Sequence, residues 1–293
     1  MRKKHGYRGV SLALAALLII LCTACGRADA GTAANDAKES AADRIQETAK
    51  AENAPAAAGT ETENTGGETD KGGPDTDSAE TPEREEEDMG GKATLLYQGH
   101  ASVRITTAEG KTIYVDPYMG EGYDAPADLI LVTHGHRDHT QTDLIETKNA
   151  DCRTITWKET LSGGQHQNYD FGYVQVESVE AGYNSNHDVT QCVGYILTFS
   201  GGVTLYLSGD TSTTPQMKEF AERDLDYAFF CCDGIYNMDV TEAIECARLV
   251  GAKHSIPYHM VPGSVGGFDR QVAESFDVPD RIILKPGEEL ILK

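Results

Sequence analysis

The feature that most constrains this chain is a histidine-rich stretch directly after a short apolar run. Residues 132–140 read Val-Thr-His-Gly-His-Arg-Asp-His-Thr. The preceding run, Asp128–Val132, is short and rich in branched residues, which is typical of a buried strand. Imidazole and carboxylate together suit Zn²⁺, Mn²⁺ or Fe²⁺ rather than Ca²⁺. The stretch therefore predicts a metal site where a strand ends.

The spacing within this motif predicts two neighbouring sets of ligands. Strand side chains alternate, so His134 and His136 can point the same way. Asp138 and His139 are adjacent and cannot both point with that pair, so we expect a turn after His136 and a second set beyond it. The alternative is a polar loop with incidental histidines.

Residues 1–24 predict an export signal. Four basic residues and no acid precede a short apolar run, Val10–Leu21, which is too short to span a bilayer comfortably. The sequence Thr23-Ala24-Cys25-Gly26 resembles a bacterial lipobox, although Cys22 stands where that pattern prefers Leu. The resemblance implies lipidation of Cys25 and an exported protein anchored to the cell membrane and facing outward. An ordinary cleaved signal peptide is the alternative.

Residues 25–90 predict a disordered acidic tether. From residue 26 to residue 90 there are 18 acidic against 6 basic side chains and no Trp, Phe or Tyr, within a chain of net charge −22. Such a segment cannot bury enough apolar surface to offset its ordering entropy. A dedicated binding tail is the alternative. The acidic balance also argues against a nucleic-acid partner, because no stripe of Lys and Arg is present to neutralise phosphates.

Residues 91–293 are long enough for one domain with a sizeable core. Apolar runs predict strands over 94–97, 102–105, 112–115, 129–132, 154–157, 173–179, 194–199, 203–207, 227–231 and 282–284. Helical periodicity covers 142–148, 216–223, 240–250 and 270–276. Periodicity alone predicts a mixed α/β or α+β domain, and no pattern predicts an oligomeric state.

Five cysteines fall in this domain, and none has the spacing of a metal site. They are Cys152, Cys192, Cys231, Cys232 and Cys246. We interpret them as structural thiols, with a disulfide as the alternative.

From about Lys92 to Lys293 the sequence resembles the metallo-β-lactamase fold superfamily, and within it the branch of predicted metal-dependent hydrolases that contains the ascorbate-6-phosphate lactonases. The resemblance rests on the motif at 134–139, on His187 in a polar loop, on Asp210 in Ser-Gly-Asp-Thr and on His259 at a strand end. It implies an αββα four-layer sandwich with the metals at one edge of the sheets.

The resemblance also implies a dinuclear centre, with zinc as the first choice and manganese or iron as alternatives. The first cation would take His134, His136, His187 and Asp210. The second would take Asp138, His139, Asp210 and His259. No Cys occupies a ligand position, which argues against the zinc β-lactamases that use a thiolate, and His136 stands where a flavodiiron-type site has Glu. The pattern therefore favours hydrolysis over oxygen reduction.

Four further polar residues are candidates for the pocket. His100 lies in Gly-His-Ala-Ser, which resembles an element found early in this branch, and a purely structural hydrogen bond is its alternative role. Asp233, Tyr236 and Asn237 follow a predicted strand, where turn and capping chemistry is the alternative.

We therefore expect a metal-dependent hydrolase at the cell surface that acts on a small-molecule ester, lactone or phosphodiester. A hydroxide held by both metals would attack, with Asp138 and Asp210 as the catalytic carboxylates. A surface protein that binds metal or a partner without turnover is the alternative from another class, and a β-lactam hydrolase is a third.

Overall fold

The computed structural model describes residues 91–263 and 266–293. The predicted signal at 1–24, the predicted lipidation site at Cys25 and the predicted tether at 25–90 lie outside the described residues. None of the helices within the described ranges is long and apolar enough to cross a membrane.

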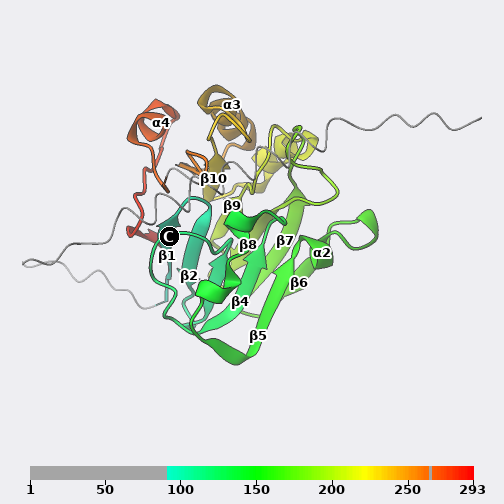
Figure 1. The fold of residues 1–293 in the computed structure, drawn as a ribbon, viewed down its shortest axis with the longest axis vertical. Coiled ribbons are helices and arrows are strands. Elements are labelled where there is room, and N and C mark those ends of the chain that lie inside the picture. The colour runs from blue at the N-terminus through cyan, green and yellow to red at the C-terminus, as the bar shows by residue number, and fades with distance from the viewer. Residues whose placement is uncertain (1–90, 264–265) are drawn as a thin grey trace, which may run out of the picture. The chain divides into compact units, whose positions relative to one another are not determined.

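Two six-stranded sheets form the framework of the described domain (Figure 1). The first sheet has the order β12 (Glu289–Leu292), β1 (Ala93–Gly99), β2 (Ser102–Thr106), β3 (Thr112–Val115), β4 (Ala127–Val132) and β5 (Lys148–Thr156). The second has the order β11 (His254–Tyr258), β10 (Tyr227–Cys231), β9 (Thr204–Leu207), β8 (Val193–Phe199), β7 (Val174–Glu180) and β6 (Asn168–Asp170).

Parallel pairing brings several strand ends to one edge. Strands β3, β4 and β5 run parallel in the first sheet, as do β9, β10 and β11 in the second. The other neighbouring strands pair antiparallel. Because parallel strands end at the same edge, the polar segments that follow β4, β9, β10 and β11 can meet there.

One hydrophobic core joins the two sheets. Buried side chains such as Val103 and Ile105 of β2 and Leu197 of β8 belong to the same cluster. The Tyr195 hydroxyl donates to the carbonyl of Val132 at 2.9 Å and thereby links β8 to β4. Each such apolar side chain contributes about 2 kcal/mol by burial, so the core fixes the strand ends that carry the site.

Helices are few and short in the described domain. They comprise α2 (Trp157–Thr160), α3 (Val240–Val250), α4 (Arg270–Ser275) and the 3-10 segments η1 (Arg137–His139), η2 (Thr142–Leu144), η3 (Ser162–Gly164) and η4 (Pro215–Arg223). Helix α3 begins at the cap Asp239, whose side chain accepts from the Glu242 N–H, and ends at left-handed Gly251. Its buried face, Ala243, Cys246, Ala247 and Val250, has helical spacing.

The predicted sandwich of two sheets with helices is confirmed, with fewer helices than a full four-layer arrangement suggests. The outer face of β3 and β4 is covered largely by loop residues, since Tyr123 and Ile145 pack there with Tyr114 and Ile130.

Three element predictions were wrong. Residues 142–148 form only the short η2, and Lys148 already begins β5, which the prediction started at Thr154. Trp157 begins α2 rather than ending a strand. Residues 282–284 make no strand; Arg281 forms one isolated bridge with Ser255, and the last strand is β12. Strands β6 and β12 were not predicted.

Candidate metal centre

All seven predicted ligands lie together where the strands of both sheets end. His134 and His136 follow β4, and η1 supplies Asp138 and His139 one turn later. His187 lies in the β7–β8 loop, while Asp210 follows β9 and His259 follows β11. Sequence-distant segments therefore supply a single cluster of imidazoles and carboxylates.

The first predicted set forms a compact group. His134, His136 and His187 each offer a nitrogen, and these atoms lie within 4.8 Å of one another, a spacing that could hold a metal ion. His134 Nε2 and His136 Nδ1 are 3.1 Å apart, so the two side chains point the same way, as predicted. Asp210 Oδ2 lies 3.3 Å from His187 Nε2 and 3.9 Å from His134 Nε2.

The second predicted set lies beside the first. Asp138, His139 and His259, together with His100, form another group whose potential ligand atoms lie within 4.8 Å of one another. Asp210 Oδ1 lies 3.4 Å from His139 Nε2, and Asp210 Oδ2 lies 3.3 Å from His259 Nε2. Asp210 is therefore near nitrogens of both sets, as a shared carboxylate must be.

These distances fit cation coordination better than they fit a hydrogen-bond network. Adjacent ligand atoms of a tetrahedral zinc site with bonds of about 2.0–2.1 Å lie about 3.3 Å apart, close to most of the separations above. His139 Nε2, His259 Nε2 and Asp210 Oδ1 are buried and make no hydrogen bond. Buried polar atoms without partners are rare and costly, and divalent cations would satisfy all three.

Electrostatics also favour positive charge between these groups. Burial alone would raise the pKa of Asp210, but His259 and His139 hold that pKa well below its usual range. Burial would lower the pKa of His259, but Asp210 and Asp233 raise it to about 10. The buried carboxylates thus require positive charge nearby, which protons or metal ions can supply.

Three of the predicted ligand histidines make a further contact through Nδ1. His139 Nδ1 lies 2.9 Å from Asp116 Oδ2, and His259 Nδ1 lies 3.2 Å from Asp233 Oδ2. His187 Nδ1 contacts Asn184 Oδ1 at 3.1 Å. Such partners fix the tautomer and ring orientation of a metal-binding imidazole.

The backbone is strained at the same place. His100, Asp116 and His259 are three of the six non-glycine residues with positive φ among the described residues, at 54°, 46° and 44°. Non-glycine residues adopt this conformation only where the surroundings impose it. The site is therefore held at a cost to the backbone.

Three of the four predicted pocket residues contact the predicted ligands, and Tyr236 contacts a neighbouring loop. His100 lies against Asp138, and Asn237 donates from Nδ2 to Asp210 Oδ2 at 2.9 Å and to Asp233 Oδ2 at 2.8 Å. Asp233 Oδ1 also accepts from the backbone N–H groups of residues 235 and 236, so its predicted turn role holds as well. Tyr236 is tied to the neighbouring loop through its carbonyl, which accepts from Asn186 Nδ2 at 3.1 Å.

Sequence analysis missed Asp116 and Asn184. Asp116 directly follows β3 and accepts from both the N–H and the hydroxyl of Thr133 as well as facing His139. Its place directly after a predicted strand is a signal that it shares with Asp210, which the resemblance identified. Asn184 stands in the loop of His187, three residues before it.

The five cysteines of the described domain are free thiols, so the disulfide alternative is wrong for them. Cys192, Cys231, Cys232 and Cys246 are buried, and Cys152 is half-buried. Within the described residues, no cysteine belongs to a group that could hold a metal.

The sequence matches a known family over the part of the chain that carries the site. The β-lactamase superfamily domain matches residues 94–259, which is more than half of the chain and includes all seven predicted ligands.

Relatives of the chain share one description. A UPF0173 metal-dependent hydrolase of Geobacillus sp. is 32% identical over 227 residues, covering 68% of this chain and 99% of that protein. Another of Rubrobacter xylanophilus is 27% identical over 238 residues, covering 70% of this chain and 98% of that protein.

Solved structures show the same fold. A provisionally named metal-dependent hydrolase of Parabacteroides distasonis is 27% identical with a TM-score of 0.54, covering 66% of this chain and 91% of that one. A metallo hydrolase of Ignicoccus hospitalis is 21% identical with a TM-score of 0.55, covering 69% and 99%, and shows the fold alone. Because the domain match, these relatives and the clustered ligands agree, the chain belongs to the metallo-β-lactamase superfamily, and within it to the UPF0173 metal-dependent hydrolases.

Proposed function

We propose that this protein uses two divalent cations to hydrolyse a carboxylic ester, a lactone or a phosphodiester. Zinc is the first choice for both cations. The observation that carries the proposal is the position of Asp210. Its two carboxylate oxygens lie 3.3–3.4 Å from nitrogens of His187, His139 and His259, which belong to both ligand sets. A single cation would not need a carboxylate shared in this way.

The clustered residues fit that pair of cations. His134, His136, His187 and Asp210 would hold one, and Asp138, His139, Asp210 and His259 would hold the other. When bound, such cations lower the pKa of a coordinated water and polarise a carbonyl or phosphoryl oxygen.

The chain's own residues set the direction of approach. His134, His139, His187, Asp210 and His259 are buried, whereas His136 and Asp138 are half-buried. Substrate therefore approaches over His136 and Asp138. The Asp138 side chain is 32% exposed and is the carboxylate nearest that opening, so it can hold the proton that leaves the attacking water.

The choice among substrates follows from the resemblance to the lactonase branch, and it is an analogy of fold and motif. A panel of nitrophenyl esters, lactones and bis(4-nitrophenyl) phosphate tests it, with nitrocefin as the β-lactam probe. We expect turnover of at least one of the first three classes and none of nitrocefin.

The same panel tests the mechanism through Asp210→Ala, which we expect to lose most bound metal and all measurable turnover. Asp128→Asn is the matched control, because Asp128 accepts hydrogen bonds from Thr112 and Lys111 at the opposite end of β4. Activity that survives in Asp210→Ala would refute the proposal. Metal binding by the wild type without any turnover would favour the non-enzymatic alternative.

We further propose that Cys25 carries the lipid that anchors the protein at the cell surface, on the evidence of the sequence alone. Cys25→Ser should release the protein into the medium, whereas Cys22→Ser should leave it with the membrane fraction. Membrane retention of Cys25→Ser would remove the lipoprotein proposal.

A further inference from the structure

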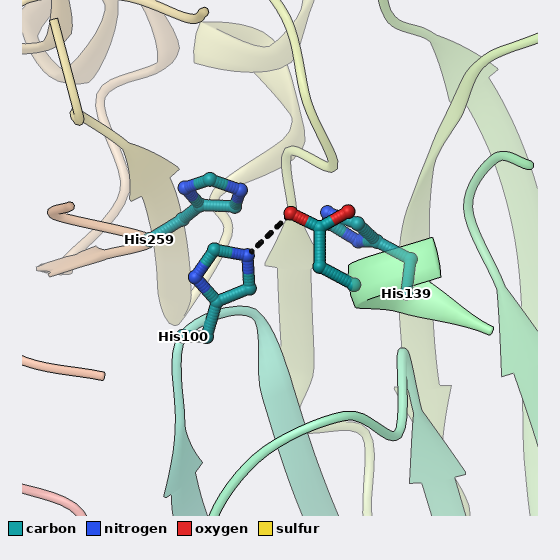
Figure 2. A group of neighbouring side chains, drawn as sticks. His100, His139 and His259 are labelled. Carbon is teal, nitrogen blue, oxygen red and sulfur yellow. Dashed lines mark hydrogen bonds and ion pairs between the residues drawn. The ribbon is translucent and has the colours of Figure 1, made fainter. Parts of the chain in front are cut away.

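His100 is a histidine that the proposed metal ligands do not include, yet it lies inside their cluster. Its side chain is wholly buried, and its ring lies against that of His259 with centroids 3.7 Å apart (Figure 2). Its Nε2 lies 3.1 Å from Asp138 Oδ2, the contact drawn as a dashed line in Figure 2. The ring of Tyr118 meets it edge-on at 5.3 Å.

The partner of Nε2 decides which atom carries the proton. An ionised carboxylate oxygen only accepts hydrogen bonds, so the nitrogen that contacts Asp138 must carry a hydrogen. His100 Nδ1 is buried without a hydrogen-bond partner. A bare nitrogen there costs less than an unpaired N–H group. The favoured form is therefore protonated at Nε2, and a protonated nitrogen has no lone pair for a metal. Nδ1, on the other side of the ring, points away from His139 (Figure 2).

The backbone of His100 is fixed from three directions. Its N–H donates to the Gly267 carbonyl at 3.2 Å, and its carbonyl accepts from the Tyr97 hydroxyl at 3.0 Å and from the His259 N–H at 2.9 Å. These contacts hold the residue at a φ of 54° in the turn between β1 and β2. The donor is thus preset rather than selected on metal binding.

Asp138 is the ligand that most needs such a donor. It lies on the three-residue η1, and its side chain is 32% exposed, whereas that of Asp210 is 4% exposed. An exposed carboxylate keeps rotamer freedom that it loses when it binds a cation. A fixed hydrogen bond to Oδ2 removes that freedom in advance and leaves Oδ1 to face a cation.

Packing alone does not account for a histidine here. Burying an imidazole with an unpaired Nδ1 costs free energy that a hydrophobic side chain of similar size would not. The contact with Asp138 is what an apolar replacement would lose.

Building on the proposed function, we propose that His100 is a positioning residue that donates a hydrogen bond from Nε2 to Asp138 and thereby presets this carboxylate for the second cation. His100 does not itself bind the metal. In the second set, Asp138 is thus held by a histidine, just as His139 and His259 are held by carboxylates.

The test compares three variants of the full chain loaded with Co²⁺. His100→Gln places an amide N–H near the position of Nε2, His100→Asn places one near Nδ1, and His100→Phe keeps the ring volume without a donor. We expect the affinity of the second site for Co²⁺ to fall about 10–100-fold in the Asn and Phe variants. It should return to within a few-fold of wild type in the Gln variant.

Two further readouts separate positioning from packing. The visible Co²⁺ spectrum of the second site should change in the Asn and Phe variants and not in the Gln variant. X-ray absorption of the Co²⁺ protein should count the same number of imidazole ligands in wild type and in His100→Gln. Thermal unfolding of the metal-free variants controls for damage to the core.

The outcomes are distinguishable from failure of the proposed function. A wild type that binds fewer than two Co²⁺ ions would count against the dinuclear proposal itself. A wild type that binds two, with His100→Phe binding them equally well, would overturn the role of His100 alone. Loss of one imidazole ligand in His100→Gln would also overturn it, by making His100 a ligand.

Discussion

At the scale of single residues, the side chains that hold the proposed ligands in place matter as much as the ligands themselves. His134, His136, Asp138 and His139 stand together in the sequence, and the order of His187, Asp210 and His259 after them carries the resemblance. Asp116 contacts Thr133 across a sequence separation of 17 residues and His139 across 23. The pairing of β3 with β4 brings it there, so these contacts are set by the tertiary structure.

The role of Asp116 leads to the first prediction. Asp116→Asn keeps the side-chain volume and a residue type that tolerates positive φ, but it removes the charge facing His139. We expect zinc affinity to fall about 10–100-fold, as for other partners of ligand histidines. Competition with a chromophoric chelator measures this. Asp128→Asn, far from the site, should leave zinc affinity unchanged, and an equal loss in both variants would contradict the assigned role.

At the scale of elements, predictions succeeded where burial is periodic and failed where tertiary contacts decide. Helix α3 was predicted with its observed bounds because its apolar residues recur at helical spacing. The structure adds that Asp239 caps its start and left-handed Gly251 its end. Strand β5 is mostly exposed, so its sequence shows no alternation, and pairing with β4 makes it a strand. Residues 282–284 are apolar, but Pro286 and a turn at 285–288 follow them before β12.

A pair of glycines tests how tightly the elements beside the site are packed. Gly120 and Gly110 have similar φ values of 81° and 75°. A Cβ at Gly120 would lie 1.8 Å from the carbonyl oxygen of Gln98 at the end of β1, whereas one at Gly110 would meet nothing within 4 Å.

We expect Gly110→Ala to lower the free energy of unfolding by about 1 kcal/mol through backbone strain. Gly120→Ala should lower it by about 3 kcal/mol, because overpacking adds to the same strain. Urea unfolding measures both. Similar losses in the two variants would show that the turn after β3 can move away from β1.

At the scale of the whole molecule, the site joins the two sheets. His134 and His136 extend from β4 of the first sheet, whereas Asp210 and His259 extend from β9 and β11 of the second. A cation held by both sets of residues therefore binds the native state and has no comparable site in the unfolded chain.

Metal removal should consequently destabilise the domain. We expect a chelator to lower the unfolding temperature by about 5–10 °C and added Zn²⁺ to restore it. Trp157, the only tryptophan of the chain, lies against Gly135, which stands between His134 and His136. A Cβ at Gly135 would lie 2.9 Å from the Trp157 ring, so the fluorescence of this tryptophan reports on the site directly. An unfolding temperature that does not respond to the chelator, in a protein shown to carry metal beforehand, would contradict this link.

The proposed pair of cations is tested most directly by the number of metal ions that the purified protein binds. Inductively coupled plasma mass spectrometry measures this number after zinc loading and dialysis. We predict close to two ions per chain in the wild type and in Asp128→Asn, and a large loss in Asp210→Ala, which removes the carboxylate shared by both sets. One ion or none in the wild type, or two ions retained by Asp210→Ala, would contradict this prediction.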